Sequence, residues 1–169
     1  MLKLGIIIPC FNEEAALPET NKHLIGVINS LIKSGKISDN SSLYYIDDGS
    51  SDQTWELIES LSSNSNHITG IKLSRNFGHQ NALIAGLFSA NEDALITIDA
   101  DLQDDINTIE SMVDKHLKGF DIVYGVRKKR DTDIIFKRLS ANFFYSLMRI
   151  LGAKVVDNHA DFRLLSRKS

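Results

Sequence analysis

The fold of this chain is decided by the segment Leu4-Gly5-Ile6-Ile7-Ile8-Pro9-Cys10-Phe11-Asn12-Glu13, an apolar run that ends in polar residues. Isoleucine is branched at its β-carbon and favours an extended backbone, so residues 4–8 predict a strand. Because this strand is apolar on both faces, it is typical of a buried strand in a parallel sheet. Cys10, at the end of the run, is expected to be a small core residue.

Strand-like and helix-like segments alternate outward from this first strand. Short apolar runs predict strands at residues 4–8, 43–46, 68–73, 94–98 and 120–124. Apolar residues near the 3.6-residue period predict helices at residues 17–31, 55–61, 81–90 and 106–117. Pro18 suits the first turn of the first helix, and Asp52 is expected to cap the second. The alternation predicts an α/β domain with a mostly parallel central sheet and helices on both faces.

Composition narrows the classes of function. The chain has 169 residues with 19 basic and 22 acidic side chains, which gives a formal net charge of −3. This length suits one domain, and the slightly acidic balance argues against a nucleic-acid binder. No segment reaches the ~18 consecutive apolar residues of a membrane span, and the N-terminus does not resemble a signal peptide. We therefore expect a soluble or peripheral chain, and its single cysteine fits a reducing compartment.

The character of the chain changes after Gly125. Residues 127–130 form a basic run, and residues 134–151 form a long, strongly apolar helical pattern that also carries basic side chains. Two interpretations of this pattern stay open, a helix that packs on the core and an amphipathic surface that meets a membrane or lipid. Residues 161–165 then predict a short strand with polar residues at its entry.

Polar residues follow three of the expected strands, at positions 9–13, 47–50 and 99–103. In open α/β sheets, ligands bind outside the carboxyl ends of the strands. We therefore expect these three segments to face one crevice.

Two carboxylates, Asp99 and Asp101, stand two residues apart at the end of the fourth expected strand, and on an extended chain they would point the same way. Close carboxylates repel each other unless a cation lies between them. Hard oxygen ligands select Mg²⁺ or Mn²⁺, and such sites complete their shell with substrate phosphates and water. Gln103 can add a neutral oxygen, so the sequence predicts a divalent metal site here. A pair of solvated loop carboxylates is the alternative.

A second acidic pair, Asp47 and Asp48, precedes Gly49 at the end of the second expected strand. Asp-Gly-Ser is strong turn chemistry, and Gly49 lets the chain turn sharply. The same carboxylates can accept hydrogen bonds from a base N–H or from ribose hydroxyls. Asn12 and Glu13 are predicted to serve the same nucleotide from the neighbouring strand.

No glycine-rich phosphate-binding motif occurs in the chain. Its absence disfavours P-loop and dinucleotide-binding folds. A diphosphate would instead be neutralised by the metal and by basic side chains such as Arg75 or Arg127.

Five motifs follow one another in a fixed order: IPCFNEE (8–14), IDDGSSD (46–52), LSRNFGHQ (73–80), DADLQD (99–104) and DFRLLSR (161–167). Together they resemble family 2 glycosyltransferases of the GT-A fold. More narrowly, they are similar to the polyprenyl-phosphate branch, which contains dolichyl-phosphate mannose synthases and bactoprenol glucosyltransferases. The resemblance implies one GT-A catalytic domain over residues 1–169, truncated before the C-terminal membrane-associated helices that family members commonly carry. Ile106 departs from the pattern, since the family usually has proline there.

The resemblance also implies a role for each motif. The residues that would hold the nucleotide are Pro9, Phe11, Glu13 and one or both of Asp47 and Asp48. The residues that would bind the bridging metal are Asp99, Asp101 and Gln103. Arg127 would contact phosphate, and Lys137, Arg138 and Ser140 match the acceptor-side helix. Asp161 and Arg163 match the segment that lines the acceptor site.

The implied reaction is a metal-dependent, inverting transfer of a hexose from a UDP- or GDP-linked donor to a polyprenyl phosphate. The family would place it in the cytoplasm, at the inner face of the cell membrane. A phosphate monoester has a second pKa near ~6 and is mostly ionised at neutral pH, so the acceptor needs no general base. Asp161 is therefore expected to orient groups, while Arg127 and Arg163 clamp the acceptor phosphate.

Three other functions stay open. A phosphotransferase with Asp99 as nucleophile is disfavoured, because such enzymes usually place the acidic pair on the first strand and follow it with Thr or Val, whereas here it follows the fourth strand and precedes Leu102 and Gln103. A glycosyltransferase with a saccharide hydroxyl acceptor and a non-catalytic sugar-nucleotide-binding remnant both share the expected fold. The identity of the sugar and the oligomeric state, a homo-oligomer included, are also open. Among the five histidines, His79 is the candidate for a functional role, because it lies in a matched motif.

Overall fold

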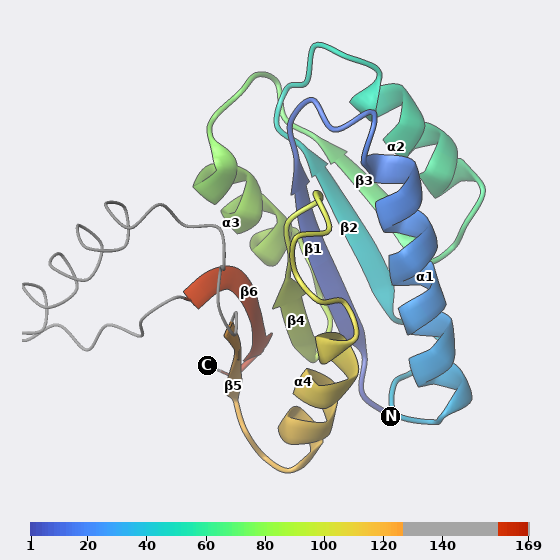
Figure 1. Ribbon diagram of the computed structural model, residues 1–169, viewed down its shortest axis with the longest axis vertical. Coiled ribbons are helices and arrows are strands. Elements are labelled where there is room, and N and C mark those ends of the chain that lie inside the picture. The colour runs from blue at the N-terminus through green and yellow to red at the C-terminus, as the bar shows by residue number, and fades with distance from the viewer. Residues whose placement is uncertain (127–158, 169) are drawn as a thin grey trace, which may run out of the picture.

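The computed structural model describes residues 1–126 and 159–168, which form a six-stranded sheet flanked by helices (Figure 1). The strands are β1 (Leu4–Cys10), β2 (Ser42–Asp47), β3 (Ile68–Lys72), β4 (Ala94–Thr97), β5 (Ile122–Val126) and β6 (His159–Ser166). The helices are α1 (Leu17–Lys33), α2 (Thr54–Ser63), α3 (His79–Ser89) and α4 (Thr108–Leu117). The predicted α/β class is confirmed, with element bounds that differ from the predicted ones by a few residues.

The strand order is β3-β2-β1-β4-β6-β5. Strands β3, β2, β1 and β4 are parallel, whereas β6 runs antiparallel to both of its neighbours. The sequence pattern predicts a strand near residues 161–165 but not its insertion between β4 and β5. Periodicity along one strand carries no information about its partners, so the position of β6 is a result of the tertiary structure.

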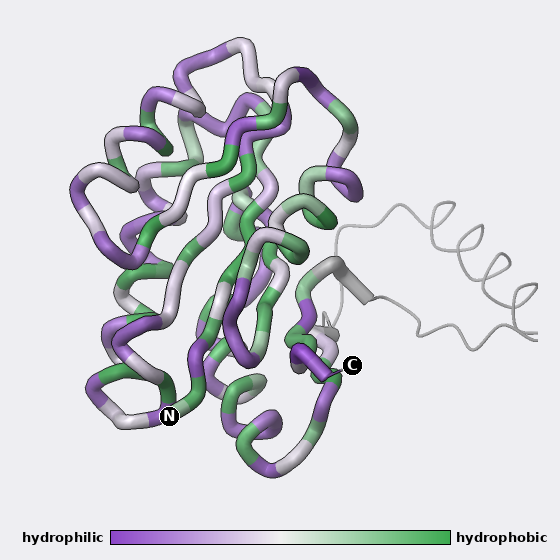
Figure 2. The backbone as a smooth tube through the Cα atoms, turned by 180° about the vertical axis from the view of Figure 1, so that it is seen from behind, coloured by the Kyte–Doolittle hydropathy of each residue, from purple (hydrophilic) through white to green (hydrophobic). Residues whose placement is uncertain are grey.

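The two faces of the sheet have separate hydrophobic clusters. Successive side chains of a strand point to opposite faces. Ile6 and Ile8 therefore pack with helices α1, α2 and α4, and Ile7 packs with α3, all three fully buried. Cys10 is buried in the first cluster, which confirms its expected core position. Figure 2 shows hydrophobic residues along the central strands and hydrophilic residues in many connecting loops.

The predicted capping role of Asp52 is wrong by one position. Helix α2 begins at Thr54, the preceding residue is Gln53, and the Gln53 side chain makes no capping hydrogen bond. The Asp52 carboxylate accepts hydrogen bonds from the Thr54 backbone N–H at 3.0 Å and from the Thr54 hydroxyl at 2.6 Å. Asp52 therefore closes a turn directly before the helix.

Several predicted features fall outside the described residues. These are the apolar helical pattern of residues 134–151 and the side chains of Arg127, Lys137, Arg138, Ser140 and Asp161. Within residues 1–126 and 159–168, none of the helices has the length and apolar character needed to cross a membrane.

Candidate active site

The carboxyl ends of β1, β2 and β4 meet at one edge of the sheet, toward the top of Figure 1. There they border a hollow of about 420 Å³, a size found for small-molecule sites. The residues that line the hollow are Pro9, Cys10, Phe11, Glu13, Asp48, Asn76, His79, Ala82, Asp99, Ala100 and Asp101. The prediction that the three strand ends share one crevice is confirmed.

Some predicted site residues are not among those that line the hollow. They are Asn12, Asp47, Arg75 and Gln103. Asp161 and Arg163 lie in β6, where Arg163 pairs with Thr97 of β4. The sequence analysis did not identify Asn76 and Ala82 as lining residues. The available signal was the motif at residues 73–80, which contains Asn76 and ends two residues before Ala82.

Asn12 ties the loop after β1 to the loop after β2. Its backbone is left-handed, with a φ of 56°. The Asn12 side-chain oxygen accepts a hydrogen bond from the Ser51 backbone N–H at 2.9 Å, and the Asn12 N–H donates to the Ser50 hydroxyl at 3.0 Å. The backbone N–H of Glu13 donates to the Thr54 hydroxyl at 2.8 Å. These bonds hold the Glu13 carboxylate at the edge of the hollow.

The two carboxylates at the end of β2, Asp47 and Asp48, have different hydrogen-bond partners. The Asp48 carboxylate accepts hydrogen bonds from the backbone N–H groups of Phe77 and Gly78, at 2.8 and 2.9 Å. Asp48 thereby holds the start of α3 against the end of β2. Asp47 is fully buried, and one of its oxygens accepts from the Ser50 N–H at 3.2 Å. Its other oxygen has no hydrogen-bond partner within the described part of the chain, so Asp47 keeps an unused acceptor.

The acidic loop after β4 is a turn rather than an extended strand. Strand β4 ends at Thr97, so Asp99 and Asp101 are not in the extended arrangement predicted from their spacing. An Asp101 oxygen accepts a hydrogen bond from the Gln103 N–H at 3.0 Å, which rounds the turn. The carbonyl between the two carboxylates, that of Ala100, accepts a hydrogen bond of 2.6 Å from the buried Thr20 hydroxyl on α1. Helix α1 therefore anchors the acidic loop.

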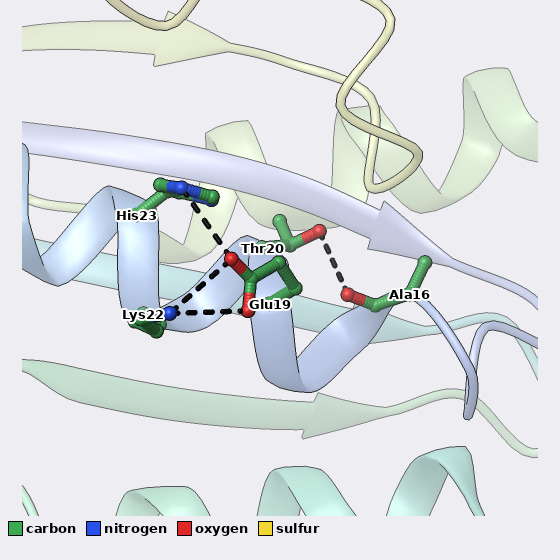
Figure 3. Close-up of polar contacts among 5 residues, drawn as sticks. All are labelled: Ala16, Glu19, Thr20, Lys22 and His23. Atoms are coloured by element: carbon green, nitrogen blue, oxygen red, sulfur yellow. Dashed lines mark hydrogen bonds and ion pairs between the residues drawn. The ribbon is translucent and has the colours of Figure 1, made fainter.

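This anchor gives a first prediction. Figure 3 shows Thr20 on α1, where its hydroxyl also lies 3.0 Å from the Ala16 carbonyl. Thr20→Val keeps the shape but leaves the Ala100 carbonyl without its donor, at a cost of about 1–3 kcal/mol of unfolding free energy. We expect faster amide hydrogen exchange at residues 99–103 in this variant. Thr20→Ser keeps the hydroxyl and should retain protection, and unchanged exchange in Thr20→Val contradicts the anchoring role.

The hollow is strongly acidic. Four carboxylates, those of Glu13, Asp48, Asp99 and Asp101, line it, and its lining within the described residues contains no lysine or arginine. Burial, followed by the charges of Asp101, Asp52 and Asp99, raises the pKa of Glu13 above its ordinary value. An anionic ligand would be repelled from this surface unless a cation accompanied it.

The donor set fits a hard divalent ion. Asp99 and Asp101 offer carboxylate oxygens from one turn, the ligand type that Mg²⁺ and Mn²⁺ prefer. Within residues 1–126 and 159–168, no three His, Cys, Asp or Glu side chains are grouped closely enough to hold a metal by themselves. One or two carboxylates completed by substrate phosphates and water is the usual arrangement for Mg²⁺.

Comparison with solved structures identifies the fold as GT-A type. The chain superposes on glucosyl-3-phosphoglycerate synthase from Mycobacterium tuberculosis, crystallised with Mn²⁺, UDP and phosphoglyceric acid, with a TM-score of 0.64. The alignment covers 99% of this chain and 56% of that one at 20% sequence identity.

Sequence comparison then identifies the family. Residues 5–169 match the model described as Glycosyl transferase family 2, so the chain belongs to this family and the predicted resemblance is confirmed. It is 49% identical over 168 residues to the uncharacterised glycosyltransferase YkoT of Bacillus subtilis strain 168, covering 98% of this chain and 50% of YkoT. It is 37% identical over 168 residues to the bactoprenol glucosyl transferase of Shigella phage SfV, covering 99% of this chain and 53% of that protein. The chain thus spans about half the length of these relatives.

Proposed function

We propose that the protein containing this chain transfers a hexose from a nucleotide sugar to a polyprenyl phosphate, with residues 1–169 as its catalytic domain. The observation that carries this proposal is the convergence of the acidic ends of β1, β2 and β4 on one hollow. The similarity to a protein named bactoprenol glucosyl transferase supports the acceptor class. Because that acceptor is a membrane lipid, the domain would work at the inner face of the membrane.

The donor would be a UDP- or GDP-linked sugar held at the ends of β1 and β2. The residues proposed to hold its nucleotide are Pro9, Phe11, Asn12, Glu13, Asp47, Asp48 and Arg75. Phe11 is 45% exposed and lines the hollow, so it offers an apolar surface to a base or ribose. The bonds of Asn12 to Ser51 and of Asp48 to Phe77 suggest that these two residues mainly shape the site. Asp47 has an oxygen with no hydrogen-bond partner within the described residues, but Asp47 is fully buried and does not line the hollow, so Asp48 is the member of the pair that a nucleotide in the hollow would meet.

The donor diphosphate needs a counter-charge in this acidic hollow. We propose that Asp99, Asp101 and Gln103 hold a Mg²⁺ or Mn²⁺ ion there. When bound, such an ion acts as a Lewis acid on the leaving diphosphate. The Asp99 and Asp101 carboxylates would hold the ion, and the hydrogen bond from the Gln103 N–H to Asp101 keeps the turn in shape.

The acceptor side would be built from β6 and from residues that follow β5. The residues proposed for it are Arg127, Lys137, Arg138, Ser140, Asp161 and Arg163. An oxygen of the acceptor phosphate would form the new bond to the anomeric carbon, on the side opposite the donor diphosphate. The old bond from the anomeric carbon to the diphosphate oxygen breaks, and its electron pair leaves with the nucleoside diphosphate. Since the acceptor is already ionised, Asp161 would orient it and would not need to remove a proton.

The nucleotide arm of the proposal is tested by thermal unfolding with UDP and with GDP, each in Mn²⁺ and in EDTA. A nucleotide at 100 times its dissociation constant stabilises by about 2.7 kcal/mol, which corresponds to a rise in Tm of about 5–10 °C at this chain length. We expect one nucleotide to give this rise only with the metal. If neither UDP nor GDP raises the Tm in the presence of Mn²⁺, the proposal is contradicted and a non-catalytic remnant is favoured.

The acceptor arm is tested by sugar transfer to undecaprenyl phosphate and, in parallel, to oligosaccharides. We expect labelled sugar in the lipid fraction. Transfer only to the oligosaccharides would contradict the proposed lipid-phosphate acceptor and would identify a sugar hydroxyl as the acceptor.

A further inference from the structure

His79 is a residue of the hollow to which neither the proposed reaction nor the comparisons assign a task. It is the first residue of α3, and its side chain lines the hollow together with Asp99. Among the described lining residues, it is the only lysine, arginine or histidine. The described lining therefore combines one basic side chain with four carboxylates.

The contact of His79 is with a proposed metal ligand. Its ring nitrogen Nε2 lies 3.7 Å from an oxygen of Asp99, and the two side chains are 43% and 35% exposed. This distance is in the range of an ion pair and slightly longer than a direct hydrogen bond. A small rotation of either side chain would bring Nε2 within hydrogen-bond distance of the carboxylate.

The backbone directly before His79 is held by hydrogen bonds and by close packing. The backbone N–H groups of Phe77 and Gly78 donate to the buried Asp48 carboxylate. Gly49 packs against residues 75 and 76 so closely that a β-carbon there would lie 2.4 Å from the Arg75 carbonyl carbon. The end of β2 therefore fixes where α3 begins, and with it the position of His79 relative to the end of β4.

We propose that His79 is a positioning residue that orients the Asp99 carboxylate for the divalent cation, an inference that rests on the proposed function. Carboxylates that ligate a metal are commonly held by a second hydrogen bond from outside the metal shell, and losing it typically weakens metal affinity 10- to 100-fold. The His79 ring nitrogen lies near one Asp99 oxygen, and this contact would fix the orientation of the carboxylate. Asp48 contributes indirectly, because it accepts hydrogen bonds from the two residues that precede His79.

The test is a titration of the chain with Mn²⁺ in the presence of UDP, and in a second series GDP, with free ion measured by electron paramagnetic resonance. The same titration without protein measures the ion held by the nucleotide alone. His79→Asn retains an amide near the Nδ1 position but removes the donor at Nε2. We expect Mn²⁺ affinity to fall at least about 10-fold in this variant. His79→Gln places an amide N–H near the Nε2 position and should restore affinity to within about threefold of the original.

The matched control is His23→Asn. His23 lies on α1, where its Nε2 is 3.5 Å from an oxygen of Glu19, so it makes the same type of contact away from the hollow (Figure 3). This control should bind Mn²⁺ as the original chain does. The urea midpoint in EDTA is expected to be unchanged in His79→Asn, which separates a positioning effect from a folding defect.

Two contrary results are distinguishable. If His79→Asn binds Mn²⁺ within twofold of the original chain, the role of His79 is wrong and the proposed function stands. If the original chain holds no Mn²⁺ beyond the nucleotide blank in either series, the proposed function fails, and the inference fails with it.

Discussion

Asp101→Asn is expected to lower kcat/KM for sugar transfer by at least about 10³-fold, which corresponds to about 4 kcal/mol of transition-state stabilisation. Asp101 lines the hollow beside Asp99, and the carboxylates of this turn are the proposed ligands of the divalent ion. Asparagine keeps one oxygen and the size of the side chain but removes the negative charge. The hydrogen bond from the Gln103 N–H can be retained, so the turn should keep its shape.

The measurement is steady-state transfer from the nucleotide sugar over a range of Mn²⁺ concentrations. Asp105→Asn is the matched control, because it removes an exposed carboxylate from the same loop that does not line the hollow. We expect the control to remain within about threefold of the original rate. A loss smaller than about tenfold in Asp101→Asn would show that this carboxylate is not needed for catalysis.

Gly49→Ala is expected to have the largest effect on stability, a loss of about 3 kcal/mol or more in the free energy of unfolding. Gly49 has a φ of 70°, a left-handed conformation that costs a residue with a β-carbon about 1–2 kcal/mol. Its new β-carbon would also lie 2.4 Å from the Arg75 carbonyl carbon and 2.6 Å from the Asn76 nitrogen. These are backbone atoms that cannot rotate away, so the loop before α3 has to shift.

Urea unfolding measures this loss, and Gly35→Ala is its control. Gly35 has the same φ of 70°, but its β-carbon would meet only the end of the Met1 side chain at 3.8 Å. We expect about 1 kcal/mol of destabilisation there, from the backbone conformation alone. Equal losses at the two glycines would mean that the close approach of residues 49 and 75 does not matter.

The part of the fold that could be predicted is the part encoded locally. Three consecutive isoleucines at 6–8 and the apolar run before Asp99 predict buried strands, because such side chains exclude water on both faces of a sheet. The convergence of the acidic loops could be predicted as well, since parallel neighbouring strands end at the same edge. The turn at Gly49 followed from residue chemistry and is confirmed by its φ.

Some site features depended on contacts that have no local signal. From the sequence, one or both of Asp47 and Asp48 are expected to hold the nucleotide, and nothing distinguishes the two. In the structure, Asp48 accepts two N–H groups from a loop about 30 residues further along the chain, whereas Asp47 keeps an unused oxygen. The bond from Thr20 to the Ala100 carbonyl spans 80 residues and could not be anticipated either.

The sequence alone determined the succession of strands and helices along the chain, the family, and the residues that form the acidic strand ends. These could be predicted because hydrophobic periodicity and short motifs are properties of neighbouring residues. The tertiary structure alone decided that β6 enters between β4 and β5, that Asp48 serves the scaffold and that His79 faces Asp99. Such pairings arise when distant segments pack to satisfy buried polar groups, and no local pattern specifies which partners they find.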